Sequence, residues 1–128
     1  GFWPDTISTD LHSSSIMGTQ SDMPNCMTKM MALGMSLADA VAKSTMMPAK
    51  VISRFPEIGT LGVGKGADVT VLALREGVFS LKDSWGKKQL ATKKVEAVLT
   101  IRNGKLVFDA EGRGYPEWTK AGDYEVLP

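Results

Sequence analysis

The sequence has 128 residues, which suffices for one domain with a hydrophobic core. A complete (β/α)8 barrel needs about 250 residues, so a whole barrel is excluded. Fifteen Lys and Arg against fourteen Asp and Glu leave a formal net charge of +1, without the basic stripe that binds a nucleic-acid backbone. No apolar run approaches the roughly 18 residues of a membrane span. We therefore expect neither nucleic acid nor a membrane as a partner.

The cysteine content and the first residues bear on location. Cys26 is the single cysteine, so no internal disulfide can form, which favours a reducing compartment and a half-buried structural thiol. The opening GFWPD contains no Met and lacks the flank and apolar segment of a signal peptide, so it is typical of the interior of a longer chain. These features predict a cytoplasmic protein.

The stretch TISTDLHSSS, residues 6–15, is a short β-prone run that ends in a carboxylate. We expect a strand that ends at Asp10, as in barrel enzymes that carry a catalytic group there, although ordinary strands end in the same way. His12 is the only histidine of the chain. A lone histidine is more often structural than functional, so Asp10 is the stronger candidate.

Helical spacing of apolar residues fills the next part of the chain. It predicts three short helices, over residues 24–34, 36–44 and 45–55, with Ser36 and Thr45 as the N-caps of the second and third. The methionines gather in this half of the sequence. Thioethers mostly fill irregular core space, so core packing is favoured over soft-metal binding.

The second half is rich in Gly and β-branched residues. We expect a strand over 69–74, a strand and loop within 77–87, and a hairpin over 95–112. Asn103 and Gly104 form one of the strongest short turn signals, because a type I′ turn needs positive φ at both central positions.

Two further stretches of this half have ordinary structural interpretations. KKQLATKK, residues 87–94, is the densest basic run and is predicted to be a solvated loop or turn. GVGKGAD, residues 62–68, is followed by a predicted strand instead of a helix, so its glycines indicate turns instead of a phosphate-binding loop.

Four segments in this order resemble the C-terminal portion of a metal-dependent amidohydrolase of the dihydroorotase-like branch, especially its amidohydrolase/deacetylase metallohydrolases. They are STDLH, LGMSLADAVAKSTMMPAKVI, GTLGVGKGADVTVL and IRNGKLV. The most specific piece is G-x-L-x-x-G-x-x-A-D-V-T at residues 59–70. The similarity extends from the first residues to about Asp109.

The resemblance implies an α/β fragment, in which the last strand and helices of a (β/α)8 metallohydrolase barrel precede the C-terminal strands of a small β-sandwich. Residues 1–56 would form the end of the barrel, 57–113 the sandwich portion and 114–128 a tail. The aromatic tail is expected to wrap a surface or cover a neighbouring subunit. Open strand edges would favour self-association, so a homo-oligomer is expected.

The resemblance also implies a site. Asp10 would ligate a divalent metal, commonly zinc. It would also act as general base for a water that attacks an amide or ester bond, including that of a cyclic amide, of a small-molecule substrate. His12, and on weaker grounds Met17 and Gly18, would border the substrate. The family's other metal ligands, including its His-x-His pair, are not among these residues, so the chain alone is expected to bind metal weakly and to be inactive.

One departure and two alternatives accompany this hypothesis. Met47 stands where relatives carry Asn in T-x-N-P-A, so a capping or turn contact is expected to be lost. A ring deaminase of the same superfamily would use the same carboxylate, because both reactions pass through water attack on an sp² carbon. The chain could also be a non-catalytic β-rich module that serves packing or partner binding.

Overall fold

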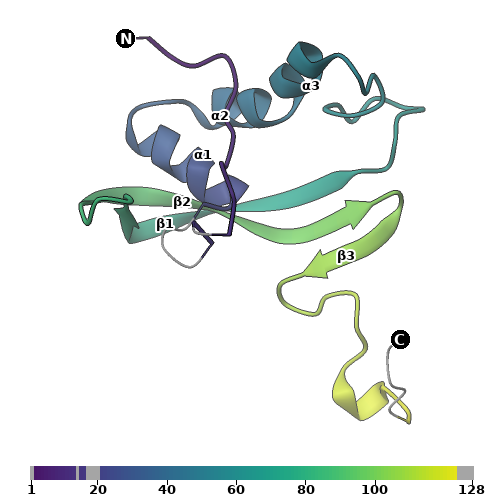
Figure 1. Cartoon of the computed structure of the whole chain (residues 1–128). Helices are drawn as coiled ribbons and strands as arrows, with labels where there is room; N and C mark the ends of the chain where they lie inside the picture. Colours follow the sequence, from purple (N-terminus) through teal and green to yellow (C-terminus); the bar gives the residue numbers. More distant parts are fainter. Residues whose placement is uncertain (1, 14, 17–20, 124–128) are drawn as a thin grey trace.

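A computed structural model describes residues 2–13, 15–16 and 21–123 (Figure 1). Three helices lie on one side of an antiparallel sheet whose strand order is β1-β2-β3. The described elements are α1 (Met23–Ala32), α2 (Leu37–Ser44), α3 (Met46–Ile52), β1 (Val69–Lys82), β2 (Lys88–Arg102), β3 (Lys105–Asp109) and the 3-10 helix η1 (Trp118–Lys120). Within this part of the chain no helix is long and apolar enough to cross a membrane.

The caps explain where the helices begin. The Asp22 carboxylate accepts a hydrogen bond from the Asn25 N–H at 2.8 Å, which starts α1. The Ser36 hydroxyl accepts one from the Asp39 N–H at 3.0 Å and donates to the Asp39 carboxylate at 2.7 Å, as predicted from the sequence. Thr45 is the N-cap residue of α3, as predicted, but its side chain makes no capping hydrogen bond, because its hydroxyl donates to the Val41 carbonyl of α2.

The third helix is also shorter than predicted. α3 ends at Ile52 because Ser53 adopts a left-handed conformation with φ of 53°. Residues 53–55 therefore lie outside the helix. Met47 lies within α3, so the residue at the place of the family's Asn belongs to the helix itself.

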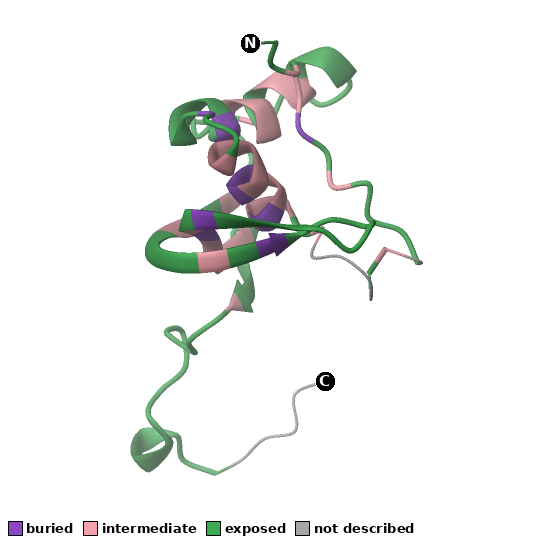
Figure 2. Ribbon diagram, turned by 90° about the vertical axis from the view of Figure 1, so that its left-hand side faces the viewer, coloured by how far each residue is buried: buried purple, intermediate pink, exposed green. Residues whose placement is uncertain are grey.

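The core lies between the helices and the sheet, and Figure 2 shows its buried residues on α1 and on the strands beside it. Its buried members are Ile7, Met27, Met35, Ala40 and Val95, with Met23, Cys26, Met30, Met31 and Leu72 packed against them. The prediction that the methionines fill the core is confirmed for the five methionines of this set. Cys26 is half-buried as expected, and burial raises the pKa of its thiol, which keeps it protonated at neutral pH.

A buried hydroxyl joins α1 to the sheet. Thr28 is 1% exposed, and its hydroxyl donates to the Pro24 carbonyl at 2.8 Å and accepts from the Val95 N–H at 2.9 Å. β3 pairs with β2 only over residues 99–102 of β2. At Val95, which β3 does not reach, α1 supplies the acceptor for the backbone N–H instead. At the other end of α1, the Gln89 side-chain amide donates to the Ala32 carbonyl at 3.2 Å.

The structure corrects three predictions about strands. Residues 88–94 form the first half of β2 and not a loop, because each pairs with β1 or lies in its bulge, and Ala91 is buried. β1 runs through residues 69–82 as one strand, whereas the sequence predicted a strand over 69–74 and a separate strand and loop within 77–87. The predicted strand over residues 6–10 is not formed, since the sheet pairs none of these residues, and Ile7 donates its N–H to the Lys43 carbonyl of α2 at 2.8 Å.

The predicted turn at Asn103 and Gly104 is confirmed, with φ of 49° and 74°. Asp68 holds this turn, because its carboxylate accepts a hydrogen bond from the Asn103 N–H at 2.7 Å. The Gly104 N–H donates to the Ala67 carbonyl at 3.1 Å. The Ala-Asp pair of the G-x-x-A-D-V-T motif therefore has a structural role as the clamp of the β2–β3 hairpin.

Charged side chains connect the strands to the start of the tail. Arg75 contacts Glu96 at 3.2 Å and Glu111 at 3.6 Å, and Lys94 contacts Glu96 at 3.0 Å. Hydrogen bonds from Lys94 and Arg75 hold the pKa of the Glu96 carboxyl below its ordinary value. The pKa of Asp109 is lowered chiefly by the backbone N–H of Gly114, at 2.7 Å.

The tail leads away from the sheet (Figure 1). Its described residues, 114–123, are exposed, with Tyr115 at 62% and Trp118 at 81%. These residues do not wrap the body of their own chain. The expectation that the tail covers a neighbouring subunit stays a prediction.

We predict that Thr28→Val destabilises the fold. The substitution removes both hydrogen bonds and leaves the Val95 N–H buried without its partner, which costs about 1–3 kcal/mol of unfolding free energy. Urea denaturation measures the change. Thr45→Val is the matched control, because that hydroxyl also donates to a helix carbonyl but the residue is exposed, and a loss of less than about 0.5 kcal/mol is expected. Equal effects of the two variants would show that the Thr28 link is unimportant.

We predict that Asp68→Ala loosens the β2–β3 hairpin while Asp68→Asn does not. Asparagine keeps a side-chain oxygen to accept from Asn103, whereas alanine leaves that N–H to solvent. Amide exchange at residues 103 and 104 should quicken in the alanine variant, with a stability loss of about 0.5–1.5 kcal/mol. Unchanged exchange in both variants would contradict the clamp.

We predict that stability falls on acidification. The pKa values of Glu96 and Asp109 are lowered in the folded chain, so their contribution is present above their ordinary values of 4.5 and 3.8 and is lost as pH falls through the lowered ones. Thermal melting from pH 7 to pH 2.5 should show this decline. Glu96→Gln should reduce the slope below pH 4.5, and an unchanged slope would count against the Glu96 part.

Candidate active site

The N-terminal segment before α1, which we call the arm, carries Asp10 and His12. Ile7 joins this arm to the helices. Ile7 is 8% exposed and belongs to the core, and its N–H bonds to the end of α2. Asp10 follows three residues later, where the chain has emerged from the core. The helices thus determine where the arm leaves the body. No sequence pattern predicted that the Lys43 carbonyl would accept the hydrogen bond from Ile7.

Asp10 lies at a corner of the arm. Its φ is 48°, in the left-handed region that Asp and Asn tolerate better than most residues. The Leu11 N–H donates to the Thr9 hydroxyl at 3.3 Å, and the Asp10 carbonyl accepts from the Ser15 hydroxyl at 3.3 Å. The Asp10 residue is exposed, and hydrogen bonds within the described part of the chain end on its carbonyl and not on its carboxylate.

The hydroxyl of Ser15 organises the turn after Asp10. It accepts from the His12 N–H at 3.0 Å and lies 3.1 Å from the His12 carbonyl, a second acceptor for its proton. The N–H groups of Ser15 and Ile16 also donate to the His12 carbonyl, at 3.0 and 3.1 Å. The polar residues after Asp10 therefore close a tight turn, which brings His12 to the surface beside the Asp10 corner.

The described residues do not complete a metal centre. In residues 2–13, 15–16 and 21–123, no three His, Cys, Asp or Glu side chains are grouped so that they could hold a metal ion. Catalytic zinc sites use several protein ligands, and Asp10 fits such a site as one hard oxygen donor. Met17 and Gly18, the other predicted site residues, lie outside the described residues.

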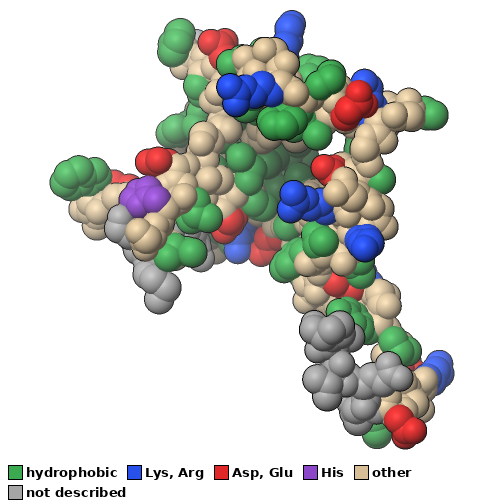
Figure 3. Space-filling view, turned by 45° about the vertical axis from the view of Figure 1, so that its right-hand side comes forward, with side chains coloured by type: hydrophobic (Ala, Val, Ile, Leu, Met, Phe, Trp, Pro, Cys, Tyr) green, Lys and Arg blue, Asp and Glu red, His purple; other side chains and the backbone are tan. Residues whose placement is uncertain are grey.

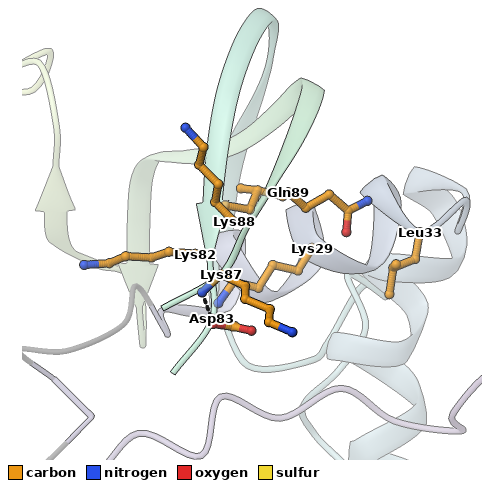
Figure 4. A pocket seen from close by; sticks show the side chains of 8 residues that line it. Lys29, Leu33, Lys82, Asp83, Lys87, Lys88 and Gln89 are labelled. Atoms are coloured by element: carbon orange, nitrogen blue, oxygen red, sulfur yellow. Dashed lines mark hydrogen bonds between the residues drawn. The ribbon is translucent and has the colours of Figure 1, made fainter. Parts of the chain in front are cut away.

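Three hollows on the described part of the chain lie away from the Asp10 corner. They have volumes of about 310, 420 and 370 Å³, are lined by residues of α1 and its flanks, the start of α2, the strands and the β1–β2 turn, and do not include Asp10 or His12. Figure 4 shows the first, between α1 and the end of the β1–β2 hairpin. Figure 3 shows hydrophobic side chains gathered at the bottom of a depression on another face.

The Amidohydrolase family model matches residues 4–107. The chain belongs to the amidohydrolase family. This match includes the Asp10 arm, the helices and most of the sheet, so the resemblance stated from the sequence motifs is confirmed.

Among curated relatives of this amidohydrolase chain, a dihydroorotase of Methanopyrus kandleri is 40% identical over 70 residues. That alignment covers 55% of this chain and 16% of the relative. A deacetylase of Enterococcus faecalis is 28% identical over 102 residues, which is 79% of this chain and 27% of the relative. The chain thus spans only about a sixth to a quarter of the length of these two proteins.

Two solved structures resemble the fold. An adenine deaminase has a TM-score of 0.74 and 28% identity, over 80% of this chain and 28% of the other. A dihydroorotase has a TM-score of 0.74 and 30% identity, over 84% of this chain and 29% of the other. The small antiparallel sheet with its helices is therefore an amidohydrolase-type arrangement. The two neighbours have different reactions in their names, so the likeness does not separate hydrolysis from deamination.

Proposed function

We propose that this chain is the C-terminal portion of a metal-dependent amidohydrolase that acts on an amide or ester bond of a small molecule. The observation that carries the proposal is the family match over residues 4–107, which includes an exposed carboxylate at a defined corner of an anchored arm. In this proposal residues 1–56 belong to the barrel, 57–113 to the β-sandwich and 114–128 form a tail.

The proposed role of Asp10 follows from its chemistry and exposure. Its carboxylate is one ligand of a divalent metal, with zinc as the expected ion, and the remaining ligands come from parts of the family fold outside these residues. When bound, such a metal lowers the pKa of a water molecule toward about 7. Asp10 accepts a proton from the attacking water and passes it to the leaving group, which is ordinary general acid–base work for a carboxylate.

The neighbouring turn would serve substrate binding. His12 is exposed two residues after Asp10, and its backbone is held on both sides by Ser15. We assign the imidazole to substrate contact, and the segment around Met17 and Gly18 to the border of the pocket. The Ser15 hydroxyl would be a positioning group, since it fixes the backbone of both Asp10 and His12.

Exposed apolar side chains support the view that the helices pack against a further part of the fold. Val51 and Ile52 at the end of α3 and Phe55 after it are 66%, 55% and 56% exposed. Large contiguous apolar surface is unusual on a stable monomer and marks a contact surface. In the proposed full enzyme, the barrel and the helices bury these residues.

Deamination of a ring is the second candidate, because the adenine deaminase and the dihydroorotase structures match this chain with the same TM-score. The proposed role of Asp10 is the same in both reactions. Two assays separate these activities. A deaminase releases ammonia from aminated heterocycles, whereas an amide hydrolase opens the ring of cyclic amides.

We predict that Asp10→Asn in the full amidohydrolase lowers kcat/KM by about 10³-fold or more, because Asn cannot accept the proton. Zinc content, measured by elemental analysis, should fall as well. Asp5→Asn is the matched control, since Asp5 is an exposed carboxylate on the same arm. Equal activity of the two variants would remove Asp10 from the mechanism.

The 128-residue chain gives a second measurement. Calorimetric titration with zinc should show only weak binding, because the described residues group no three ligands. Tight binding that persists in Asp10→Asn would contradict the proposed site and favour a self-contained module with its own ligands.

A further inference from the structure

We infer that Thr9 and Ser15 are positioning residues, whose hydroxyls bind the two backbone N–H groups that follow Asp10 and thereby leave its carboxylate open to a metal ion and a proton. The inference rests on the proposed function of Asp10 and deepens it, because it names the groups that keep that carboxylate in use. Neither hydroxyl is assigned a contact with the substrate or the metal. Both act through Asp10.

Thr9 makes the first of the two bonds. Its hydroxyl accepts a hydrogen bond from the Leu11 N–H at 3.3 Å, two residues farther along the chain. Ser and Thr hydroxyls close short turns in this way. The residue enclosed by this turn is Asp10, whose φ of 48° is unfavourable for most residues that carry a Cβ atom. The Thr9 bond therefore supports the corner at which Asp10 lies.

Ser15 makes the second bond from the other side of the corner. Its hydroxyl accepts from the His12 N–H at 3.0 Å, and the carbonyls of Asp10 and His12 lie 3.3 and 3.1 Å away as acceptors for its proton. Thr9 and Ser15 are half-buried, whereas Asp10 is exposed. The part of the corner that is open to solvent is thus Asp10 and not the hydroxyls that hold it.

The N–H that Ser15 binds is the one that an aspartate readily takes for itself. Asp side chains commonly accept a hydrogen bond from the backbone N–H two residues on, which for Asp10 is the His12 N–H. Such a bond would direct the carboxylate toward its own backbone. With Ser15 on that N–H, the hydrogen bonds between Asp10 and the described residues end on its carbonyl. The carboxylate oxygens keep their acceptor capacity for the proposed chemistry.

The corner is separate from the contacts that fold the chain. Both hydroxyls bond within the arm, and the arm is anchored by Ile7, which belongs to the core and donates to the Lys43 carbonyl at 2.8 Å. Loss of either hydroxyl is therefore expected to change the corner without unfolding the protein.

The first test uses the 128-residue chain and no activity. Ser15→Ala removes the hydroxyl from the His12 N–H, so the Asp10 carboxylate should take its place. Three-bond NMR couplings to the Asp10 Cγ should then show that this side chain settles in one rotamer. Ser15→Thr keeps a hydroxyl and should leave the couplings near those of the unmodified chain. Unchanged couplings in Ser15→Ala would overturn the inference.

The Thr9 bond is tested by amide hydrogen exchange in the same chain. Thr9→Val should speed exchange of the Leu11 N–H by about threefold or more, and Thr9→Ser should not. Thr60→Val is the matched control, because the Thr60 hydroxyl accepts from the Gly62 N–H at 3.0 Å with the same spacing and lies in another part of the chain. Equal exchange of Leu11 in Thr9→Val and Thr60→Val would remove Thr9 from the corner.

The second test measures activity in the full amidohydrolase. Thr9→Val should lower kcat by about tenfold or more with KM within about twofold, because it misplaces the carboxylate and keeps the groups that border the substrate. Thr9→Ser should restore kcat to within about threefold, and Thr60→Val should leave it unchanged. Ser15→Ala should lower kcat and zinc content together.

The results separate this inference from the proposed function. Activity lost in Asp10→Asn but kept in Thr9→Val and Ser15→Ala would overturn the inference alone. A Thr9→Ser enzyme as slow as Thr9→Val would also overturn it, because the hydroxyl would then not be the group that matters. Full activity in Asp10→Asn would overturn the proposed function, and this inference with it.

Discussion

The Thr28 hydroxyl is the contact on which the rest of this small structure depends. Over most of their length β1 and β2 form a two-stranded ribbon without β3, and such a ribbon needs a helix packed against it to be stable. Thr28 fixes that helix in place, because its hydroxyl satisfies the Val95 N–H at a point that β3 does not reach. With α1 held there, Met27 and Val95 enter one core with Ile7, and Ile7 in turn fixes the arm that carries Asp10.

Local chemistry made several features predictable. Ser36 and Asp39 lie within one helical turn, so the cap needs no tertiary information, and the same holds for Asn103 and Gly104 in their turn. The methionine core followed from helical spacing. These signals act over a few residues, and each is recognisable in the sequence without knowledge of the fold.

Features that depend on distant partners were not predictable in this way. Residues 88–94 look like a solvated basic loop, but pairing with β1 makes them a strand, and its exposed lysines are compatible with a sheet edge or face in water. The run over residues 6–10 has strand composition, yet a strand exists only through a neighbour that accepts its hydrogen bonds. For the candidate site, the motif singled out Asp10, but neither its left-handed backbone nor the role of Ser15 could be inferred from spacing.

The left-handed conformation of Asp10 has a consequence for what can occupy this position. Backbone preference alone admits Gly and Asn most readily, with Asp close behind, while longer or branched side chains are strained there. The proposed acid–base role alone would admit Asp or Glu. Under that proposed role aspartate meets both requirements, whereas Glu would keep the carboxylate but strain the backbone. The left-handed corner thus limits which residues fit position 10 more tightly than charge or exposure would.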